Sequence, residues 1–173
     1  MSEKNEASLQ RAILAGGCFW GVEYWLSKLP GVRRATSGYT GGDVENPTYE
    51  AVKLGTTGHY EAVLVEFDPS ETDFGTICRR FLEIHDPGQS DGQGPDIGPQ
   101  YRSAIFYTNA AQQAIAASLL AILRNRRYKV VTELLPAVHF WPAEAYHQRY
   151  SDRHAIEPEC HVPVQRFDDT PRH

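Results

Sequence analysis

"AILAGGCFWGVEYWLSKLPGV", the stretch from Ala12 to Val32, has the pattern of a strand that turns directly into a helix. A short apolar run ends at two glycines, Cys18 follows, and apolar side chains then recur at helical spacing from Phe19 up to a Pro-Gly pair. We therefore predict a buried strand over residues 11–15, a turn at the glycines and a helix after them. Cys18 would lie where that helix begins.

Strands and helices continue to alternate downstream. The segments "VRRATSGYTGG", "YEAVLVEF" and "RSAIFYT" predict three more strands, and apolar residues at helical intervals predict a helix over residues 74–84 between the last two. The order over residues 11–108 is strand, helix, strand, strand, helix, strand. This order matches a split βαβ arrangement with helices on one face of a mostly antiparallel sheet. We predict an α+β fold, a ferredoxin-like two-layer sandwich.

The remaining regions are a loop, a helix, a strand and a tail. The run "PGQSDGQGPDIGP", residues 87–99, is too rich in Gly and Pro for regular structure, and we expect a helix capped by Asn109 and a strand near residues 130–135 after it. Beyond Tyr150 the chain is polar and has neither periodicity. We therefore predict a polar N-terminal extension (residues 1–10), an α+β domain carrying the catalytic residues (11–150) and an irregular C-terminal tail (151–173).

The composition limits what the chain can do. With 173 residues, 41% of them hydrophobic, it can bury one core. A formal net charge of -5 with dispersed Lys and Arg residues argues against a broad cationic surface, so we expect no nucleic-acid partner. The N-terminal "MSEKNEASLQ" has no apolar h-region, and no apolar stretch is long enough to cross a bilayer. We expect no membrane association and a cytoplasmic location.

The three cysteines are Cys18, Cys78 and Cys160, and no Cys-x-x-Cys pair occurs. An odd number without such a pair argues against a disulfide framework and a zinc ribbon, and no histidine spacing supports tetrahedral zinc. We therefore expect no bound metal or cofactor, and we expect any disulfide to be transient and catalytic. Cys78 falls in the apolar stripe of the helix over residues 74–84, where a thiol is more often structural than reactive.

Cys18 is the first candidate for chemistry. Unpaired N–H groups and the positive end of the helix dipole favour a thiolate at this position, and adjacent glycines let a ligand approach the backbone closely. The alternative is an ordinary buried cysteine that packs as a small hydrophobe. Position alone leaves both roles open.

Glu61 is the second candidate. In "YEAVLVEF" it shares one strand face with Val63, Val65 and Phe67. Burial there would raise the pKa of its carboxyl and keep it protonated as a general acid near neutral pH. The alternative is a wet sheet edge, which would make Glu61 an ordinary surface residue. His59, close by, is most simply a loop histidine.

Several other side chains could serve either the core or a site. Tyr49 and Tyr101 lie at junctions between loops and regular elements, where a phenol can fill space and donate a hydrogen bond. Phe19 and Trp20 could seal the core or form the wall of an apolar pocket beside the thiol. Asp96 could cap the following turn or orient a tyrosine.

Seven segments together give the chain a family resemblance. They are "GGCFWGVE", "SGYTGG", "NPTYE", "GHYEAV", "FLEIHDP", "QYRSAIFY" and "FWPAEAYHQRY". In this order they resemble the methionine sulfoxide reductase A family, whose members reduce methionine-S-sulfoxide in peptides and as the free amino acid. The resemblance covers about residues 14–150.

The resemblance implies roles for the candidate residues. Cys18 would be the nucleophile and Glu61 the acid that protonates the sulfoxide oxygen. The remaining implied roles are hydroxyl donors to that oxygen for Tyr49 and Tyr101, support for Asp96, and an apolar seat for the substrate methyl group for Phe19 and Trp20. The sulfenic acid left on Cys18 would form a disulfide with Cys160, and thioredoxin would reduce it.

Two segments depart from the family pattern. "EPECHVPV" replaces the usual glycine-flanked resolving cysteine, which leaves resolution by Cys160 a hypothesis. In "HDPGQSDGQGPD" other residues stand where the family commonly has Thr, Arg and Asn, and Pro95 removes an N–H beside Asp96. These departures concern the loop and the recycling step, not the core chemistry.

Two other functions fit parts of the pattern. In a cysteine hydrolase or acyltransferase, Cys18 would attack a carbonyl with Glu61 or His59 as base, and neither a reductant nor a second cysteine would be needed. A non-catalytic module that binds oxidised methionine would keep the aromatic wall without needing the thiol.

Overall fold

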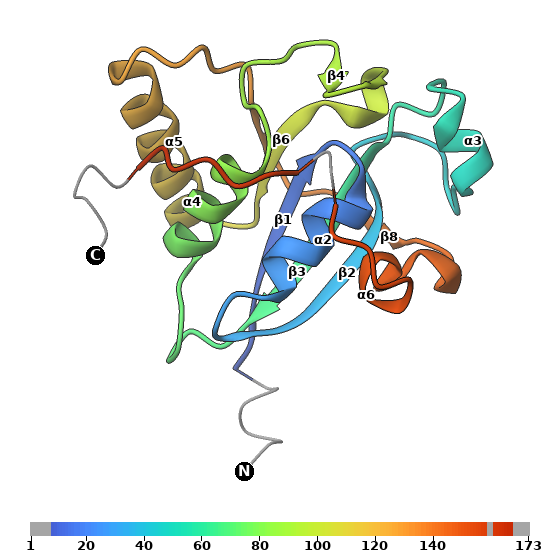
Figure 1. Ribbon diagram of the computed structural model, residues 1–173, viewed down its shortest axis with the longest axis horizontal. Helices are drawn as coiled ribbons and strands as arrows, with labels where there is room; N and C mark the ends of the chain where they lie inside the picture. The colour runs from blue at the N-terminus through green and yellow to red at the C-terminus, as the bar shows by residue number, and fades with distance from the viewer. Residues whose placement is uncertain (1–7, 159–160, 168–173) are drawn as a thin grey trace.

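The computed structural model describes residues 8–158 and 161–167 (Figure 1). Within these residues a six-stranded sheet has the order β7-β6-β1-β3-β2-β8, and β4 pairs with β5 separately. Every neighbouring pair of the larger sheet is antiparallel except β6 and β7, which are parallel. The strands are β1 (Gln10–Gly16), β2 (Val32–Thr40), β3 (Tyr60–Phe67), β4 (Gly92–Gln93), β5 (Asp96–Ile97), β6 (Ser103–Tyr107), β7 (Glu133–Pro136) and β8 (Phe140–Pro142).

Helices α2, α4 and α5 pack on one face of the sheet, while α3 and α6 lie beyond the edge that β2 and β8 form (Figure 1). The helices are α2 (Phe19–Ser27), α3 (Tyr49–Lys53), α4 (Phe74–Ile84), α5 (Ala110–Asn125) and α6 (Tyr150–Arg153), with short 3-10 turns at Pro99–Tyr101 and Ala145–His147. Asp73 and Asn109 cap α4 and α5 by accepting backbone N–H groups at 2.7 and 2.9 Å. The chain has the predicted α+β class.

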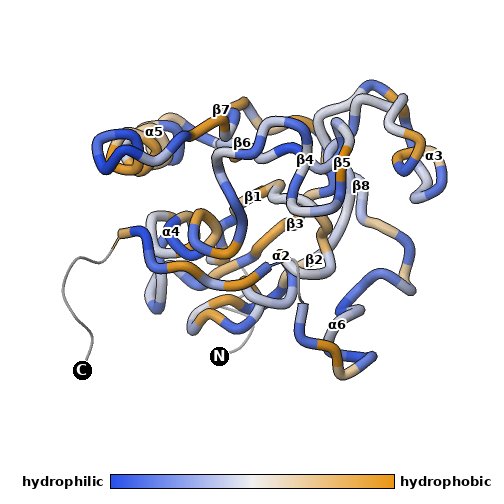
Figure 2. The backbone as a smooth tube through the Cα atoms, turned by 45° about the horizontal axis from the view of Figure 1, so that its top comes forward, coloured by the Kyte–Doolittle hydropathy of each residue, from blue (hydrophilic) through white to orange (hydrophobic). Residues whose placement is uncertain are grey.

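The alternating pattern of β3 divides the core into two clusters. Val63, Val65 and Phe67 face the helices and belong to the larger cluster, whereas Tyr60 and Ala62 face the opposite side and belong to a smaller one. In Figure 2 hydrophobic stretches run along β3 and recur on turns of α4 and α5. Both faces of the central strands are therefore buried.

The structure corrects the sequence interpretation in three places. The loop over residues 87–99 contains a small hairpin, in which Gln93 of β4 pairs with Asp96 of β5. A strand at the sheet edge, β8, was not predicted. The tail expected to be irregular from residue 151 begins inside α6. Each of these elements has only two to four residues, too few to display a periodicity.

A buried chain of hydrogen bonds joins α4 to the sheet. Nδ1 of His85 donates to the Phe81 carbonyl at 2.7 Å, so Nε2 must accept, and it lies 2.7 Å from the Ser103 hydroxyl. The Ser103 oxygen in turn accepts from Thr132 at 2.7 Å. Burial lowers the pKa of His85 to about 3, so the ring stays neutral.

Ser103→Ala is expected to lower the free energy of unfolding by about 1–3 kcal/mol, because it leaves the His85 Nε2 acceptor buried without a donor. Urea unfolding measures this loss. Ser90→Ala, at an exposed position, is the matched control. Equal changes in the free energy of unfolding for the two substitutions would contradict a structural role for the hydrogen bonds that link His85, Ser103 and Thr132.

No helix within the described part of the chain is long and apolar enough to cross a membrane.

Candidate active site

The predicted site residues gather at one end of the six-stranded sheet. Because β1 and β3 are antiparallel and Leu14 pairs with Val63, the end of β1 lies beside the start of β3. Cys18 follows β1 and Glu61 is the second residue of β3, so both lie at this end. Tyr101 ends the 3-10 turn two residues before β6 begins, and Tyr49 begins the helix that follows β2, which brings both tyrosines to the same end.

Cys18 is the N-cap residue of α2 and is partly exposed. The turn before it requires glycine at position 17, where φ is 92° and a Cβ would come 2.5 Å from the Cβ of Gln93. The strand-to-helix unit predicted from the opening stretch is therefore confirmed. Its thiol lies at the helix start, as expected.

The protonation state of Cys18 differs from the expectation based on the helix dipole. Burial and the nearby Glu61 raise the pKa of the thiol well above its usual value, while the N–H groups of Trp20 and Gly21 lower it by less. Desolvation outweighs the helix N-terminus here because most of the water that would solvate a thiolate is displaced by the surrounding protein. The neutral thiol is the favoured form.

Glu61 is 1% exposed, so the wet-edge alternative is wrong. Its Oε1 accepts the backbone N–H of Phe19 at 3.2 Å, and its Oε2 has no hydrogen-bond partner among the described residues. Burial raises the pKa of Glu61 to about 8, against the Phe19 hydrogen bond and with a further contribution from Asp96. The carboxyl is therefore protonated at neutral pH, and its Oε2 is free to donate to a ligand.

Tyr49, Tyr101 and Asp96 complete the polar side of the site. Burial, then Glu61 and Cys18, raise the pKa of Tyr49 to about 12. Burial, then Glu61 and Tyr49, raise the pKa of Tyr101 as well. Burial raises the pKa of Asp96, and the charge of Asp96 acts on Cys18, Glu61 and Tyr101. Both phenols thus keep their protons and can donate hydrogen bonds.

Aromatic rings form the apolar side of the site. Phe19 is buried in the larger core cluster and stacks on Tyr49 with centroids 6.4 Å apart. Trp20 is only partly buried, and it stacks on Tyr150 with centroids 3.8 Å apart and planes 10° apart. Phe19 therefore belongs both to the core and to the site, whereas Trp20 forms a partly exposed aromatic wall with Tyr150.

His147 is a residue of this site that the sequence interpretation missed. It is fully buried, and its Nδ1 accepts the indole N–H of Trp20 at 2.9 Å, which places the ring proton on Nε2. That Nε2 has no partner among the described residues, and burial lowers the pKa of the ring. The segment "FWPAEAYHQRY" contributed to the resemblance, but no spacing within it points to this contact.

Glu144 was missed in the same way. Its carboxylate accepts the Tyr39 hydroxyl at 2.8 Å and the backbone N–H of Tyr49 at 2.9 Å, and so holds the start of α3. Burial acts to raise the pKa of Glu144, but these hydrogen bonds outweigh it and the net pKa is lowered. Glu144 is therefore ionised, and its carboxylate holds the backbone of Tyr49 in place.

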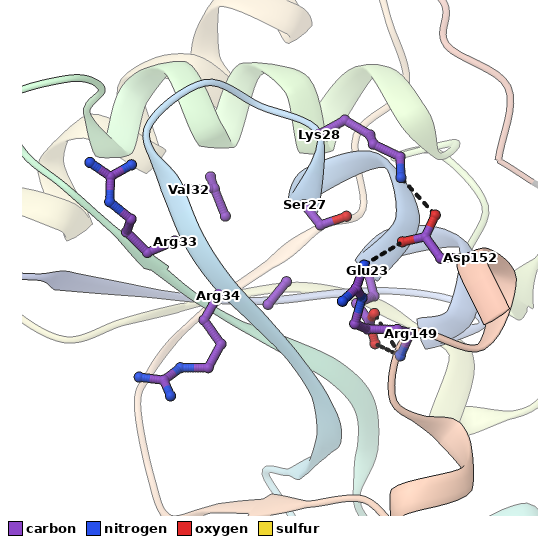
Figure 3. A pocket seen from close by; sticks show the side chains of 9 residues that line it. Glu23, Ser27, Lys28, Val32, Arg33, Arg34, Arg149 and Asp152 are labelled. Atoms are coloured by element: carbon purple, nitrogen blue, oxygen red, sulfur yellow. Dashed lines mark hydrogen bonds and ion pairs between the residues drawn. The ribbon is translucent and has the colours of Figure 1, made fainter. Parts of the chain in front are cut away.

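Glu23 anchors the segment that carries His147, beside a separate pocket of about 360 Å³ (Figure 3). Both Glu23 oxygens accept the backbone N–H of Arg149, at 2.9 and 3.0 Å, and Oε1 also accepts the Ser37 hydroxyl. Lys28 and Asp152 form an ion pair of 2.7 Å at the pocket rim. These paired charges fasten the C-terminal segment to α2.

The other two cysteines and His59 lie apart from the reactive groups described above or outside the described residues. Cys160 lies outside the described residues. Cys78 is buried in the core on α4, where burial raises the pKa of its thiol. His59 is engaged on both ring nitrogens, with the Gly42 N–H at 3.1 Å and the Val44 carbonyl at 2.7 Å. His59 is therefore not free to act as the base that a cysteine hydrolase would need.

Comparisons with known proteins agree on one family. The model of the family described as "Peptide methionine sulfoxide reductase" matches residues 10–172. A Thermus thermophilus relative named "Peptide methionine sulfoxide reductase MsrA" is 47% identical over 154 residues, which cover 88% of this chain and 88% of the relative.

Solved structures show the same fold. Mxr1 from Saccharomyces cerevisiae in its reduced form superposes with a TM-score of 0.85 at 31% identity, covering 91% of this chain and 93% of that one. The methionine sulfoxide reductase A of Corynebacterium diphtheriae gives 0.78 at 32% identity, covering 86% and 76%. Mxr1 has also been solved in complex with Trx2, a comparison of 21% identity that concerns the fold alone. The chain belongs to the peptide methionine sulfoxide reductase family.

Proposed function

We propose that this chain reduces methionine-S-sulfoxide, in proteins, in peptides or as the free amino acid, with Cys18 as the nucleophile and Glu61 as the acid. The observation that carries the assignment is the state of Glu61. A protonated carboxyl, 1% exposed and with one oxygen unpartnered among the described residues, lies near the Cys18 thiol. A sulfoxide oxygen is the acceptor that such a donor needs.

The two tyrosines and Asp96 assist Glu61 in this proposal. The phenols of Tyr49 and Tyr101 stay protonated, so each can donate to the sulfoxide oxygen as negative charge develops there. Asp96 supports the acid because its charge helps to raise the pKa of Glu61. Phe19 and Trp20 offer an apolar seat to the methyl group of the substrate.

The first step transfers one oxygen atom and two electrons. Sγ of Cys18 attacks the sulfoxide sulfur and forms an S–S bond, while Glu61 donates its proton to the sulfoxide oxygen and the thiol proton that leaves restores the Glu61 acid. The S–O bond of the substrate and the new S–S bond then break as the protonated oxygen passes to Sγ and methionine leaves. The products are methionine, whose sulfur is reduced by two electrons, and a sulfenic acid on Cys18, whose sulfur is oxidised by two. Because burial favours the neutral thiol, oxygen protonation must accompany the attack.

The second step restores Cys18. A thiolate of Cys160 attacks the sulfenic sulfur, an S–S bond forms, and the oxygen leaves as water. Thioredoxin then reduces the disulfide through its own dithiol. Mxr1, a 31% identical relative whose complex with Trx2 has been solved, supports this choice of reductant.

We also propose a ferredoxin-like arrangement of the central strands and a cytoplasmic location for the protein. The order β6-β1-β3-β2, with α2 and α4 on one face, supports a ferredoxin-like split βαβ sandwich over the central strands. A cytoplasmic location is supported by the chemistry, since a cycling thiol requires a reducing compartment. In such a compartment the enzyme would repair methionine oxidised under oxidative stress.

The separate S and R methyl sulfoxides of methionine test the function. With dithiothreitol as reductant, we expect turnover of the S epimer alone. Turnover of neither epimer would refute the proposal and leave a binding module as the interpretation. Hydrolysis of an acyl substrate without reductant would instead favour a cysteine hydrolase.

Cys160→Ser is expected to keep one stoichiometric turnover and dithiothreitol-driven activity but to lose thioredoxin-driven turnover, because the sulfenic acid has no thiol partner. Methionine formed per enzyme and NADPH consumption coupled to thioredoxin reductase measure the two activities. Cys78→Ser is the matched control, since the Cys78 thiol is buried on α4. Full thioredoxin-driven activity in Cys160→Ser would assign resolution to another group.

A further inference from the structure

Gln93 is a buried polar side chain beside the turn that carries Cys18. It belongs to β4 and is 3% exposed, although the loop around it is rich in Gly and Pro. A Cβ added to Gly17 would come 2.5 Å from the Cβ of Gln93 and 2.8 Å from its Cγ. The stem of Gln93 therefore packs on the residue that directly precedes Cys18. The two reaction steps leave this buried amide without a role.

Both polar atoms of Gln93 bind the backbone of one residue at the end of α4. Oε1 accepts the N–H of Asp86 at 2.7 Å, and Nε2 donates to the Asp86 carbonyl at 2.9 Å. An amide, unlike a carboxylate or an ammonium group, can satisfy a donor and an acceptor in this way. Asp86 directly follows His85, whose ring is hydrogen-bonded to Ser103 of β6 at 2.7 Å. Gln93 is therefore anchored to a segment that is itself bound to the six-stranded sheet.

The hairpin of β4 and β5 places Asp96 directly opposite Gln93. Each strand of this hairpin has two residues, and among the described residues neither strand pairs with the six-stranded sheet. A short isolated hairpin is not stable by itself in water, so its place on the protein depends on the side chains that anchor it. Gln93 is such an anchor because it binds the end of α4, whereas the Gln89 amide binds Gly94 within the same loop.

We propose that Gln93 is a positioning residue for the sulfoxide step, because it fastens the hairpin that carries Asp96 to the turn before Cys18. The inference rests on the proposed function, in which Cys18 and Glu61 carry out that step. The amide of Gln93 fixes the hairpin to the end of α4, and its stem fixes the hairpin against Gly17. Gln93 has no ionisable proton and takes no part in bond making. It acts through Asp96.

Asp96 acts on the acid through its charge. The groups that interact electrostatically with Glu61 come from several elements and are Cys18, Tyr39, Tyr49, Asp96 and Tyr101. The thiol and the three phenols have raised pKa values and stay neutral, whereas the charge of Asp96 adds to the effect of burial and helps to raise the pKa of Glu61. A hairpin that shifts takes this charge away from Glu61, which lowers the pKa of the acid. The acid form is then lost at a lower pH.

Gln93→Met tests the inference in the full-length enzyme. Methionine keeps the length of the side chain and its packing on Gly17 but removes both hydrogen bonds to Asp86. Single-turnover formation of methionine from the S sulfoxide is measured against pH, and its rate should fall as Glu61 loses its proton. In Gln93→Met we expect the rate below this falling limb to decrease about 10-fold. We expect the limb itself to move to lower pH by about 0.5 to 1 unit.

Gln112→Met is the matched control. Gln112 is another buried glutamine, 5% exposed, whose Oε1 accepts the Thr108 N–H at 2.9 Å and whose Nε2 donates to the Arg11 carbonyl at 2.6 Å. The same substitution thus removes a similar pair of hydrogen bonds at the opposite end of the sheet from Cys18. It should lower the free energy of unfolding, as Gln93→Met does, but leave the rate and the limb unchanged. Equal effects of both variants on the rate and the limb, or an unmoved limb in Gln93→Met, would overturn the inference.

A double variant shows whether Gln93 acts through Asp96. Asp96→Asn removes the charge and should by itself move the limb to lower pH. Adding Gln93→Met should then move the limb no further, because the charge that Gln93 positions is gone. Shifts of the limb that add in the double variant would contradict a role through Asp96.

Failure of the proposed function would look different. In that case the unmodified enzyme would form no methionine, or Glu61→Gln would keep the falling limb. Either result overturns Glu61 as the acid, and the role of Gln93 with it. A normal limb that Glu61→Gln abolishes but Gln93→Met does not move overturns the inference alone.

Discussion

Cys18→Ser is expected to lower sulfoxide reduction by about 10⁴-fold or more, as removal of a catalytic nucleophile does. A serine hydroxyl is a much weaker nucleophile than a thiol and cannot be oxidised to a sulfenic acid. The measurement is methionine formed from the S sulfoxide with dithiothreitol, which removes any dependence on Cys160. Burst and steady-state phases should both disappear.

The matched control for this substitution is Cys78→Ala, because Cys78 is buried in the core of the same chain. It should retain the single-turnover rate while lowering stability, since a small cavity replaces the sulfur. A Cys18→Ser enzyme with substantial activity would overturn the nucleophile assignment. Loss of activity in Cys78→Ala with an intact fold would mean that Cys78 takes part in the chemistry, which contradicts its structural role.

Glu61→Gln is expected to slow the sulfoxide step by about 10²- to 10⁴-fold, the usual contribution of a general acid. The amide keeps the shape of the side chain and the hydrogen bond from Phe19 but has no acidic proton. Single-turnover formation of methionine measures the effect. An unchanged rate would count against Glu61 as the acid.

The pH dependence of the sulfoxide step is a second test of Glu61 as the acid. The pKa of Glu61 is raised to about 8, so the acid form is present below that pH and is lost as the pH rises through it. In the unmodified enzyme the rate should fall above about pH 8, by about tenfold per pH unit. This falling limb should be missing in Glu61→Gln. Glu66→Gln, on the same strand but ion-paired with Arg34 at 2.9 Å, is the control and should keep it.

The main elements of the fold could be predicted from local patterns. The alternating β3 and the helically spaced α4 begin and end where the sequence predicts, because each keeps its periodic pattern over eight or more residues. The hairpin of β4 and β5 was missed because its strands have two residues each and their pairing leaves no periodicity in a Gly- and Pro-rich segment. The two-residue strands position Asp96 at the site.

The site was only partly accessible to the same reasoning. Cys18 after the paired glycines and Glu61 on an apolar strand face stood out as candidates because both depend on local position. Tyr49, Tyr101 and Asp96 acquired roles only through the family resemblance. His147 and Glu144 acquired none, because their partners, Trp20 and Tyr39, lie more than 100 residues away in the chain.

Local patterns in the sequence thus place the thiol and the acid along their elements and indicate which faces those elements bury. The protonation of the two groups depends instead on the folded surroundings. The helix start alone favours a Cys18 thiolate, but burial and Glu61 reverse that preference. Only the tertiary structure brought Gln93 against the turn before Cys18. Periodicity and helix dipoles act within a few residues, whereas desolvation and packing depend on every segment that surrounds a group.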